Sequence, residues 1–195
     1  MNPLNQQAQN QLFNEARTHH AFNAKALEVE TVRALYDLCR WAPTAFNAAP
    51  ARFVFVQSPE AKQLLCQALS EGNISQTMQA PLTVIVAIDK QFYDQLPELF
   101  PAFDARSIYT ANPALAERAG LQNASMQAAY LIMAARTLGL DCGPMTGFNP
   151  ARLDELFFPD QAWTANILIN IGYGDATKLY PRGPRLTFEQ ACRIV

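Results

Sequence analysis

The sequence predicts one globular domain in which helices alternate with a few strongly apolar strands. At 195 residues the chain is long enough to bury roughly 70% of the surface that it exposes when unfolded. Half of the residues are apolar and 16% are charged, so an ample core is available. Leu82 to Ile88 is a continuous apolar run rich in β-branched residues, which is typical of a strand buried on both faces. Ala165 to Tyr173 is the second strand expected at the centre of the domain.

The first half of the chain contains three segments in which apolar residues recur at helical spacing, which predicts helices at residues 4–18, 28–41 and 61–69. A loop of small residues and prolines at 42–50 leads into a short apolar strand at 53–56. The loop carries the hydrogen-bonding side chains of Thr44 and Asn47 among residues too small to obstruct a ligand. It is therefore either a connection or the edge of a binding site.

Residues 89–120 depart from this alternation, because aromatic side chains stand there among Pro97, Pro101 and Pro113. Such a composition predicts short helices and loops. We expect this excursion to form a lid over a binding site and to contribute to substrate selectivity.

The stretch from Leu121 to Leu138 is predicted to be a helix with small or apolar residues on almost every side. A helix without a polar face is buried, either in a core or between subunits. Gly139 is the expected stop at its C-terminal end.

The segment after this helix, Cys142 to Phe148, is rich in glycine and carries Pro144. Its glycines allow the backbone to approach a flat partner closely, and it could direct the N–H groups of Met145, Thr146 or Gly147 at a ligand atom. The alternative is a plain connection from helix to strand.

The C-terminal part continues with a helix at 151–157, for which Asn149 is the predicted cap, and ends with a short helix that begins near Thr187. Between the last strand and this helix, three basic residues lie within eight positions: Lys178, Arg182 and Arg185.

Charge and cysteine content exclude several classes of protein. The net charge of −2 lacks the basic excess of a nucleic-acid binder. The four cysteines are widely spaced and have no histidine at metal-ligand spacing, so we expect reduced thiols, no metal site and a cytoplasmic protein. No apolar run is long enough to span a bilayer. The low charged share indicates that a partner subunit covers part of the surface.

Several motifs occur together and in order along the chain. They are Arg17 in the stretch ARTH, the loop 43–50, Asn73 ahead of Ala80-Pro81, the stretches SMQAAYLI and LGLDCGPMTGF, and INIGYGDATKLYPRGPRLTFE near the end. With this set the chain resembles the FMN-dependent nitroreductase family across nearly its whole length, and most closely its malonic semialdehyde reductase branch.

The resemblance implies a nitroreductase-like α+β fold with a central, mostly antiparallel sheet flanked by helices. It also implies that residues 1–195 form a single flavin-binding domain with the lid at about 89–120. Two copies would make an intertwined homodimer with one FMN in each of two sites at the subunit interface.

The resemblance also implies roles for individual residues. Those expected at the phosphate are Arg17 and Arg182, with Lys178 and Arg185 as further basic residues. Thr18 and His19 are also expected among the cofactor-binding residues. Those expected at the ribityl chain and ring edge, from the neighbouring subunit, are Thr44 and Asn47, and Ala45 between them is expected among the cofactor-binding residues. Asn73 is expected at the pyrimidine edge of the flavin. The segment expected against the ring is Pro144, Met145, Thr146 and Gly147, with a backbone N–H of the last three near flavin N5.

The implied activity is that of an FMN-dependent oxidoreductase. NADH or NADPH would deliver a hydride to flavin N5, and malonic semialdehyde would then be reduced to 3-hydroxypropionate in a ping-pong cycle that needs no side-chain acid or base. Arg106 is either the receiver of the substrate carboxylate or half of a surface pair with Asp104. The alternatives are a general nitro, quinone or enone reductase and a flavin-binding carrier without turnover.

Two departures from the family pattern concern charge. His19 and Ala21 stand where many relatives have a serine and a second basic residue, and Gln76 stands where some have a lysine. The group that stabilises the anionic reduced flavin is therefore not identified, and His19 or His20 is a candidate if these are not plain loop histidines.

Overall fold

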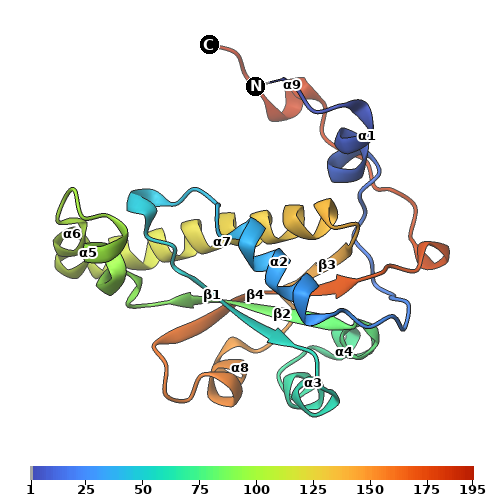
Figure 1. Cartoon of the computed structure of the whole chain (residues 1–195), viewed down its shortest axis with the longest axis horizontal. Helices are drawn as coiled ribbons and strands as arrows, with labels where there is room; N and C mark the ends of the chain where they lie inside the picture. The colour runs from blue at the N-terminus through green and yellow to red at the C-terminus, as the bar shows by residue number, and fades with distance from the viewer. Residues whose placement is uncertain (1) are drawn as a thin grey trace.

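A four-stranded sheet lies between two layers of helices in the computed structural model, which describes residues 2–195 (Figure 1). Met1, the first residue of the predicted domain, lies outside this range. The strands are β1 (Ala51–Val56), β2 (Leu82–Asp89), β3 (Asp141–Met145) and β4 (Trp163–Gly172). Their order is β1-β2-β4-β3, and every neighbouring pair is antiparallel. The predicted α+β fold with an antiparallel sheet is confirmed.

The central strand β2 is buried on both faces, as its apolar run predicted. Val84 and Val86 join the core on one side of the sheet, whereas Ile85 and Ala87 join the core on the other. None of these four side chains is exposed. Alternate residues of a strand point to opposite faces, so two helix layers are needed to cover β2.

One face of the sheet is covered by α7 (Pro113–Thr137), on which α2 (Val29–Cys39) packs. The other face is covered by α3 (Pro59–Cys66), α4 (Glu71–Gln79) and α8 (Pro150–Phe157). The Asn149 side chain accepts a hydrogen bond from the N–H of Arg152, which confirms the predicted cap of α8. Leu131 of α7 and Leu153 of α8 are fully buried in the two cores.

The excursion after β2 consists of η3 (Phe92–Gln95), α5 (Leu96–Leu99) and α6 (Ala105–Ala111). Phe92 packs edge-on against Tyr109, with the ring centroids 5.0 Å apart. The long helix begins at Pro113, whereas the sequence predicted a start at Leu121. Its first turn is closed by Asn112, whose side chain accepts from the N–H of Leu115.

The N-terminal helix is shorter than the predicted 4–18. It comprises α1 (Gln6–Gln9) and a π-helical turn, η1 (Asn10–Asn14). The chain then becomes extended, and Thr18 forms an isolated parallel bridge with Cys142 of β3. The pairing with β3 takes the place of further helix, because the backbone groups of this segment are satisfied there.

The C-terminal tail returns along this extended segment through η4 (Ala176–Lys178) and ends in α9 (Phe188–Ala191). Both chain ends project beyond the sheet on the same side (Figure 1). The helix begins at the predicted place, and Thr187 and Gln190 form a capping box at its start. No helix within residues 2–195 has the length and apolar character needed to cross a membrane.

We expect the substitution Leu131→Ala to lower the free energy of unfolding by about 2–5 kcal/mol, because it leaves a cavity where α7 packs on the sheet. Urea denaturation at fixed protein concentration measures this change. Leu4→Ala is the control, since Leu4 is 57% exposed and should change stability by less than about 0.5 kcal/mol. Equal effects of the two substitutions would contradict the assigned core.

Candidate active site

A small basic cavity lies where the N-terminal segment and the C-terminal tail meet. Its volume is about 170 Å³, and it is lined by Arg17, Thr18, His20, Tyr180, Arg182, Gly183 and Arg185. Three of these side chains are guanidinium groups, and none of these lining residues carries a carboxylate. Such a donor set suits an anion with several oxygens, above all a phosphate.

Hydrogen bonds between the two segments shape this cavity. The Arg17 guanidinium donates to the carbonyl oxygen of Tyr180. Arg182 donates from Nη2 to the carbonyl oxygens of Asn14, at 2.8 Å, and Ala16, at 3.0 Å. A guanidinium carries five N–H donors, so both side chains keep donors for a ligand. Lys178, which the sequence placed among the phosphate-binding residues, is not among the residues that line the cavity.

The N-terminal segment is held against the edge of β3. The N–H of His19 donates to the carbonyl of Cys142 over 3.0 Å. A Cβ atom at Gly143 would collide with the carbonyl oxygen of His19, so only glycine permits this approach. This contact positions Arg17 and His20 beside the cavity.

The two histidines lie in different surroundings. The His19 side chain is buried and its Nε2 lies 3.3 Å from Oδ1 of Asp141, while its Nδ1 has no hydrogen-bond partner among the described residues. Gly174 packs so closely on this ring that a Cβ there would collide with it. His19 therefore fixes the segment to β3 and the following chain, whereas His20 lines the cavity.

A chain of polar side chains runs from His20 to the segment after β3. Nδ1 of His20 lies 3.1 Å from Oε1 of Gln76, and Nε2 of Gln76 donates to Oδ1 of Asn73 over 2.6 Å. Nδ2 of Asn73 donates in turn to the carbonyl oxygen of Gly147 over 2.8 Å. The sequence identified Asn73 and Gly147 separately, and the fold brings them into direct contact.

Two backbone N–H groups of the turn after β3 make no hydrogen bond within the described residues. Within residues 2–195, neither the N–H of Thr146 nor that of Gly147 donates a hydrogen bond. A Cβ atom at Gly147 would lie 2.6 Å from Nδ2 of Asn73, so glycine is required at this point of the polar chain. Pro144 lies in β3, where an edge strand tolerates its missing donor. The Cys142–Met145 part of the segment is thus an edge strand, and the turn after it carries the free N–H groups.

Cys142 does not supply a nucleophile to this region. Burial raises the pKa of its thiol to about 12, so it stays protonated at neutral pH. All four cysteines are free.

A second group of predicted site residues lies in the loop before β1, in and beside η2 (Ala45–Asn47). The N–H of Ala45 donates to Oδ1 of Asn123, and Nδ2 of Asn47 donates to the carbonyl of Leu99. The Thr44 hydroxyl oxygen accepts from the N–H of Ala49. The Thr44 O–H and the Asn47 side-chain oxygen therefore remain available to a ligand.

This loop is also strained. Phe46 and Asn47 have φ of 52° and Ala49 has φ of 41°, although none of them is glycine. Such conformations cost about 1–3 kcal/mol each and persist only where the surroundings impose them. Contacts of the Phe46 ring with Phe100 and Tyr109 supply that constraint.

The two groups are bound to well-separated positions of α7. The loop is bound to Asn123, whereas the N-terminal segment is bound near the C-terminal end, where Arg136 donates to the carbonyl of Leu12. These two helix positions are 13 residues apart, or about 20 Å along the axis. One subunit therefore does not bring all the predicted cofactor-binding residues together.

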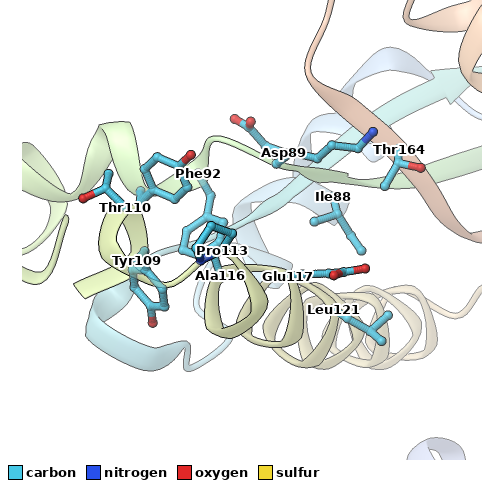
Figure 2. Close-up of a pocket in the computed structure, with 12 residues that line it drawn as sticks. Ile88, Asp89, Phe92, Tyr109, Thr110, Pro113, Ala116, Glu117, Leu121 and Thr164 are labelled. Carbon is cyan, nitrogen blue, oxygen red and sulfur yellow. The ribbon is translucent and has the colours of Figure 1, made fainter. Parts of the chain in front are cut away.

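A larger cavity of about 410 Å³ lies between the end of β2, the excursion and the start of α7 (Figure 2). Its wall includes the rings of Phe92 and Tyr109, with Asp89 and Glu117 among its polar groups. The Asp89 carboxylate is paired with Arg52 over 2.6 Å. This cavity shares no lining residue with the basic cavity.

Arg106 of the excursion pairs with Asp94, with 2.8 Å between Nη2 and Oδ1. The predicted alternative, a pair with Asp104, is wrong. Asp104 instead caps α6, where hydrogen bonds from the hydroxyl and the N–H of Ser107 lower the pKa of its carboxyl. Arg106 does not line the excursion cavity.

Two residues of the basic region were not assigned a role from the sequence. Gln76 was noted only as a departure from the family pattern, and Tyr180 was not singled out. Tyr180 lies between the basic residues Lys178 and Arg182 in the KLYPR stretch. Its position between two predicted phosphate-binding residues could have marked it as a site residue. Gln76 contacts residues 56 positions earlier in the chain, which no local pattern reveals.

Comparison with known proteins defines the class. The model of the nitroreductase family matches residues 14–173. A protein from Rhodopseudomonas palustris (strain TIE-1), named provisionally as an NADH dehydrogenase/NAD(P)H nitroreductase, is 54% identical over 185 residues, which are 95% of this chain and 94% of that protein.

Solved structures have the same fold. A Bacillus subtilis protein provisionally assigned as a nitroreductase gives a TM-score of 0.87 at 23% identity, over 94% of this chain and 97% of that one. An FMN-bound protein from Exiguobacterium sibiricum with the same provisional assignment gives a TM-score of 0.81 at 17% identity, over 100% and 99% of the two chains.

The chain belongs to the nitroreductase family. This family uses FMN with NAD(P)H, in agreement with the cofactors predicted from the sequence. The residues of this chain fit that cofactor, since the basic cavity suits a phosphate and the free N–H groups of Thr146 and Gly147 suit an electron-rich ring edge.

We expect Gly143→Ala to destabilise the protein by more than about 2 kcal/mol, because the new Cβ would push the His19 carbonyl away from β3. Faster amide hydrogen exchange at residues 17–20 should accompany the loss. Gly72→Ala is the matched control, since no atom lies within 4 Å of its added Cβ. Gly72 lies in the first turn of α4, so alanine there should raise the free energy of unfolding by up to about 1 kcal/mol. If Gly143→Ala were as stable as Gly72→Ala, the close approach would not position the segment.

Proposed function

We propose that this protein is a homodimeric, FMN-dependent NAD(P)H oxidoreductase that reduces small electron acceptors. The observation that carries the proposal is the row of hydrogen-bonded side chains from the basic cavity to the turn after β3. It occurs in a protein of the nitroreductase family. It connects a region suited to a phosphate with backbone donors suited to a flavin ring.

Each part of the cofactor has candidate partners on this chain. Arg17, Arg182 and Arg185 would hold the phosphate, with Thr18 beside them. Asn73 would contact the pyrimidine edge, and the N–H of Thr146 or Gly147 would face N5. His19, which was expected among the cofactor-binding residues, would act through the backbone of its segment, because its side chain is buried against Asp141.

When bound, FMN supplies the capacity to accept a hydride from NADH or NADPH at N5 and to pass it to a second substrate. The net reduction of an aldehyde takes one hydride from the nicotinamide and one proton from water, and releases an alcohol and NAD(P)⁺. The chain's own contribution is to bind both substrates in turn and to direct N–H donors at the electron-rich edge of the ring.

A second copy of the chain would complete each site. Thr44, Ala45 and Asn47 lie about 20 Å along α7 from the basic end, so they would serve the partner's cofactor across a two-fold axis. Exposed apolar residues on and beside α2 and α7 support this assembly, among them Trp41, which is 76% exposed, and Tyr36, Met126 and Tyr130.

Malonic semialdehyde is the acceptor that we propose first, and its product would be 3-hydroxypropionate. Support comes from the stretches that resemble the malonic semialdehyde reductase branch, from ARTH to PRGPRLTFE. Arg106 would receive the carboxylate only after leaving Asp94, because the two are paired in the isolated subunit. Its exposed position, with the side chain 51% exposed, leaves it free to exchange partners.

A general nitro, quinone or enone reductase is the second candidate. It is favoured by the name of the relative that is 54% identical, which refers to NAD(P)H nitroreductase activity. The aromatic wall of the excursion cavity also suits flat acceptors.

Spectroscopy and a substrate screen test these proposals. The purified protein, with FMN added, should be yellow and should bleach anaerobically with NADH or NADPH. Steady-state rates with malonic semialdehyde, a quinone and a nitroaromatic then rank the acceptors. A yellow protein that neither reductant bleaches would be a carrier without turnover, and a colourless one would contradict the whole proposal.

We expect Arg17→Gln to weaken FMN binding about tenfold to hundredfold, since a charge-assisted hydrogen bond contributes about 1.5–3 kcal/mol. Riboflavin, which lacks the phosphate, should bind the variant and the parent protein equally well. Quenching of flavin fluorescence measures both affinities. Lys90→Gln removes one positive charge from an exposed residue outside the basic cavity and is the control. Equal weakening of FMN and riboflavin would show that Arg17 does not recognise the phosphate.

A further inference from the structure

The direction of every hydrogen bond in the polar chain is fixed from one end. The carbonyl oxygen of Gly147 can only accept, so Asn73 must present its Nδ2 to it and its Oδ1 to Gln76. Gln76 must then donate from Nε2 to Asn73 and present Oε1 to His20. Because Oε1 can only accept, Nδ1 of His20 must carry a proton. The polar chain therefore assigns the tautomer of His20.

This assignment leaves Nε2 as the nitrogen of His20 that can change its protonation state. Within the described part of the chain Nε2 takes part in no hydrogen bond, and the residue lines the basic cavity. In the neutral form Nε2 holds a lone pair, and in the charged form it holds a second N–H donor. A histidine can make this change near neutral pH, whereas the arginines of the cavity cannot.

We propose that His20 takes up a proton at Nε2 when a phosphate monoester binds in the basic cavity, while its Nδ1–H keeps Gln76 and Asn73 in place. His20 is thus a positioning residue toward the ring and a proton-coupled donor toward the phosphate. This inference rests on the proposed function, in which the monoester is that of FMN. It concerns His20 and not His19, because His20 lines the basic cavity whereas the His19 ring lies against Asp141.

The groups that face His20 allow this coupling. Arg17 comes from the N-terminal segment, and Arg182 and Arg185 come from the tail. Tyr180 packs edge-on against the imidazole at 5.8 Å, and the neutral Gln76 approaches from α4. None of the residues that line the cavity is acidic, so a bound dianion is the negative charge that would favour the imidazolium.

Calorimetry of flavin binding to the apoprotein, in buffers of different ionisation enthalpy, counts the protons taken up. At pH 7.5 a phosphate monoester is almost wholly dianionic, since its second pKa is about 6. We expect the parent protein to take up roughly half a proton or more per FMN. Riboflavin binding should take up almost none, because it adds no anion to the cavity.

Two variants separate the roles of His20. His20→Asn keeps one N–H donor for Gln76 but has no titratable nitrogen. The number of protons taken up when FMN binds should therefore fall to near zero, while riboflavin affinity is retained. His20→Leu removes both functions, so riboflavin affinity should fall as well. Lys90→Gln is again the control and should keep the proton uptake. Because His20 is exposed, we expect the variants to fold, and melting temperatures equal to that of the parent protein would confirm it.

The outcomes distinguish this inference from the proposed function. If the parent protein and His20→Asn took up the same number of protons with FMN, the inference would be overturned and the proposed function would stand. Equal uptake with FMN and riboflavin would likewise assign the proton to the ring and not to the phosphate. A parent protein that bound neither flavin would overturn the proposed function, and the inference with it.

Discussion

The contact on which the site depends is the pairing of the N-terminal segment with the edge of β3. It needs a residue without a side chain at Gly143, because the carbonyl of His19 occupies the space of a Cβ. It also needs the buried His19 ring, which lies between Asp141 and Gly174. Given that pairing, Arg17 and His20 fall beside Gln76 on α4, and the tail closes the cavity from the other side. The N-terminal segment, α4 and the tail thus form one region around this pairing.

The basic residues and the strained loop lie at two separate positions along α7. At one end lie guanidinium groups and neutral amides, a set that binds anions and donates hydrogen bonds without general acid–base chemistry. Near the middle of the helix lies a loop with three non-glycine residues at positive φ, held by Asn123 and by aromatic packing around Phe46. The 25-residue helix, about 37 Å long, keeps these two regions at a fixed separation.

Much of the fold could be predicted from the sequence because apolar patterning reports burial. The strands β2 and β4 were found from their apolar runs, and the caps of α8 and α9 from Asn149 and Thr187. Helix α4 was missed, since its sequence, EGNISQTMQ, has no apolar stripe and its buried residues are the polar Gln76 and Thr77. Strand β3 was missed because Gly143 and Pro144 are typical of a loop.

Several residues of the candidate site could be predicted from the sequence, but their arrangement could not. Arg17, Asn73, Gly147 and Arg182 were each singled out, and the fold brings them to one region. Gln76 connects His20 with Asn73, and Asn73 contacts Gly147. Contacts between residues so far apart in the chain cannot be predicted from local spacing. The true start of α7 did have a local signal that the prediction did not use. Asn112 is a helix cap, and Pro113 is a proline at the first helical position.

The pairing at β3 has a consequence beyond ligand binding. An outer strand normally presents a row of unsatisfied amides and carbonyls on which a strand of another molecule can add, and this is a common start of aggregation. Here Pro144 lacks the donor, and the N-terminal segment occupies the carbonyl of Cys142. The same few residues that shape the anion cavity therefore protect this border of the sheet, and loss of the N-terminal segment would reopen it to self-association.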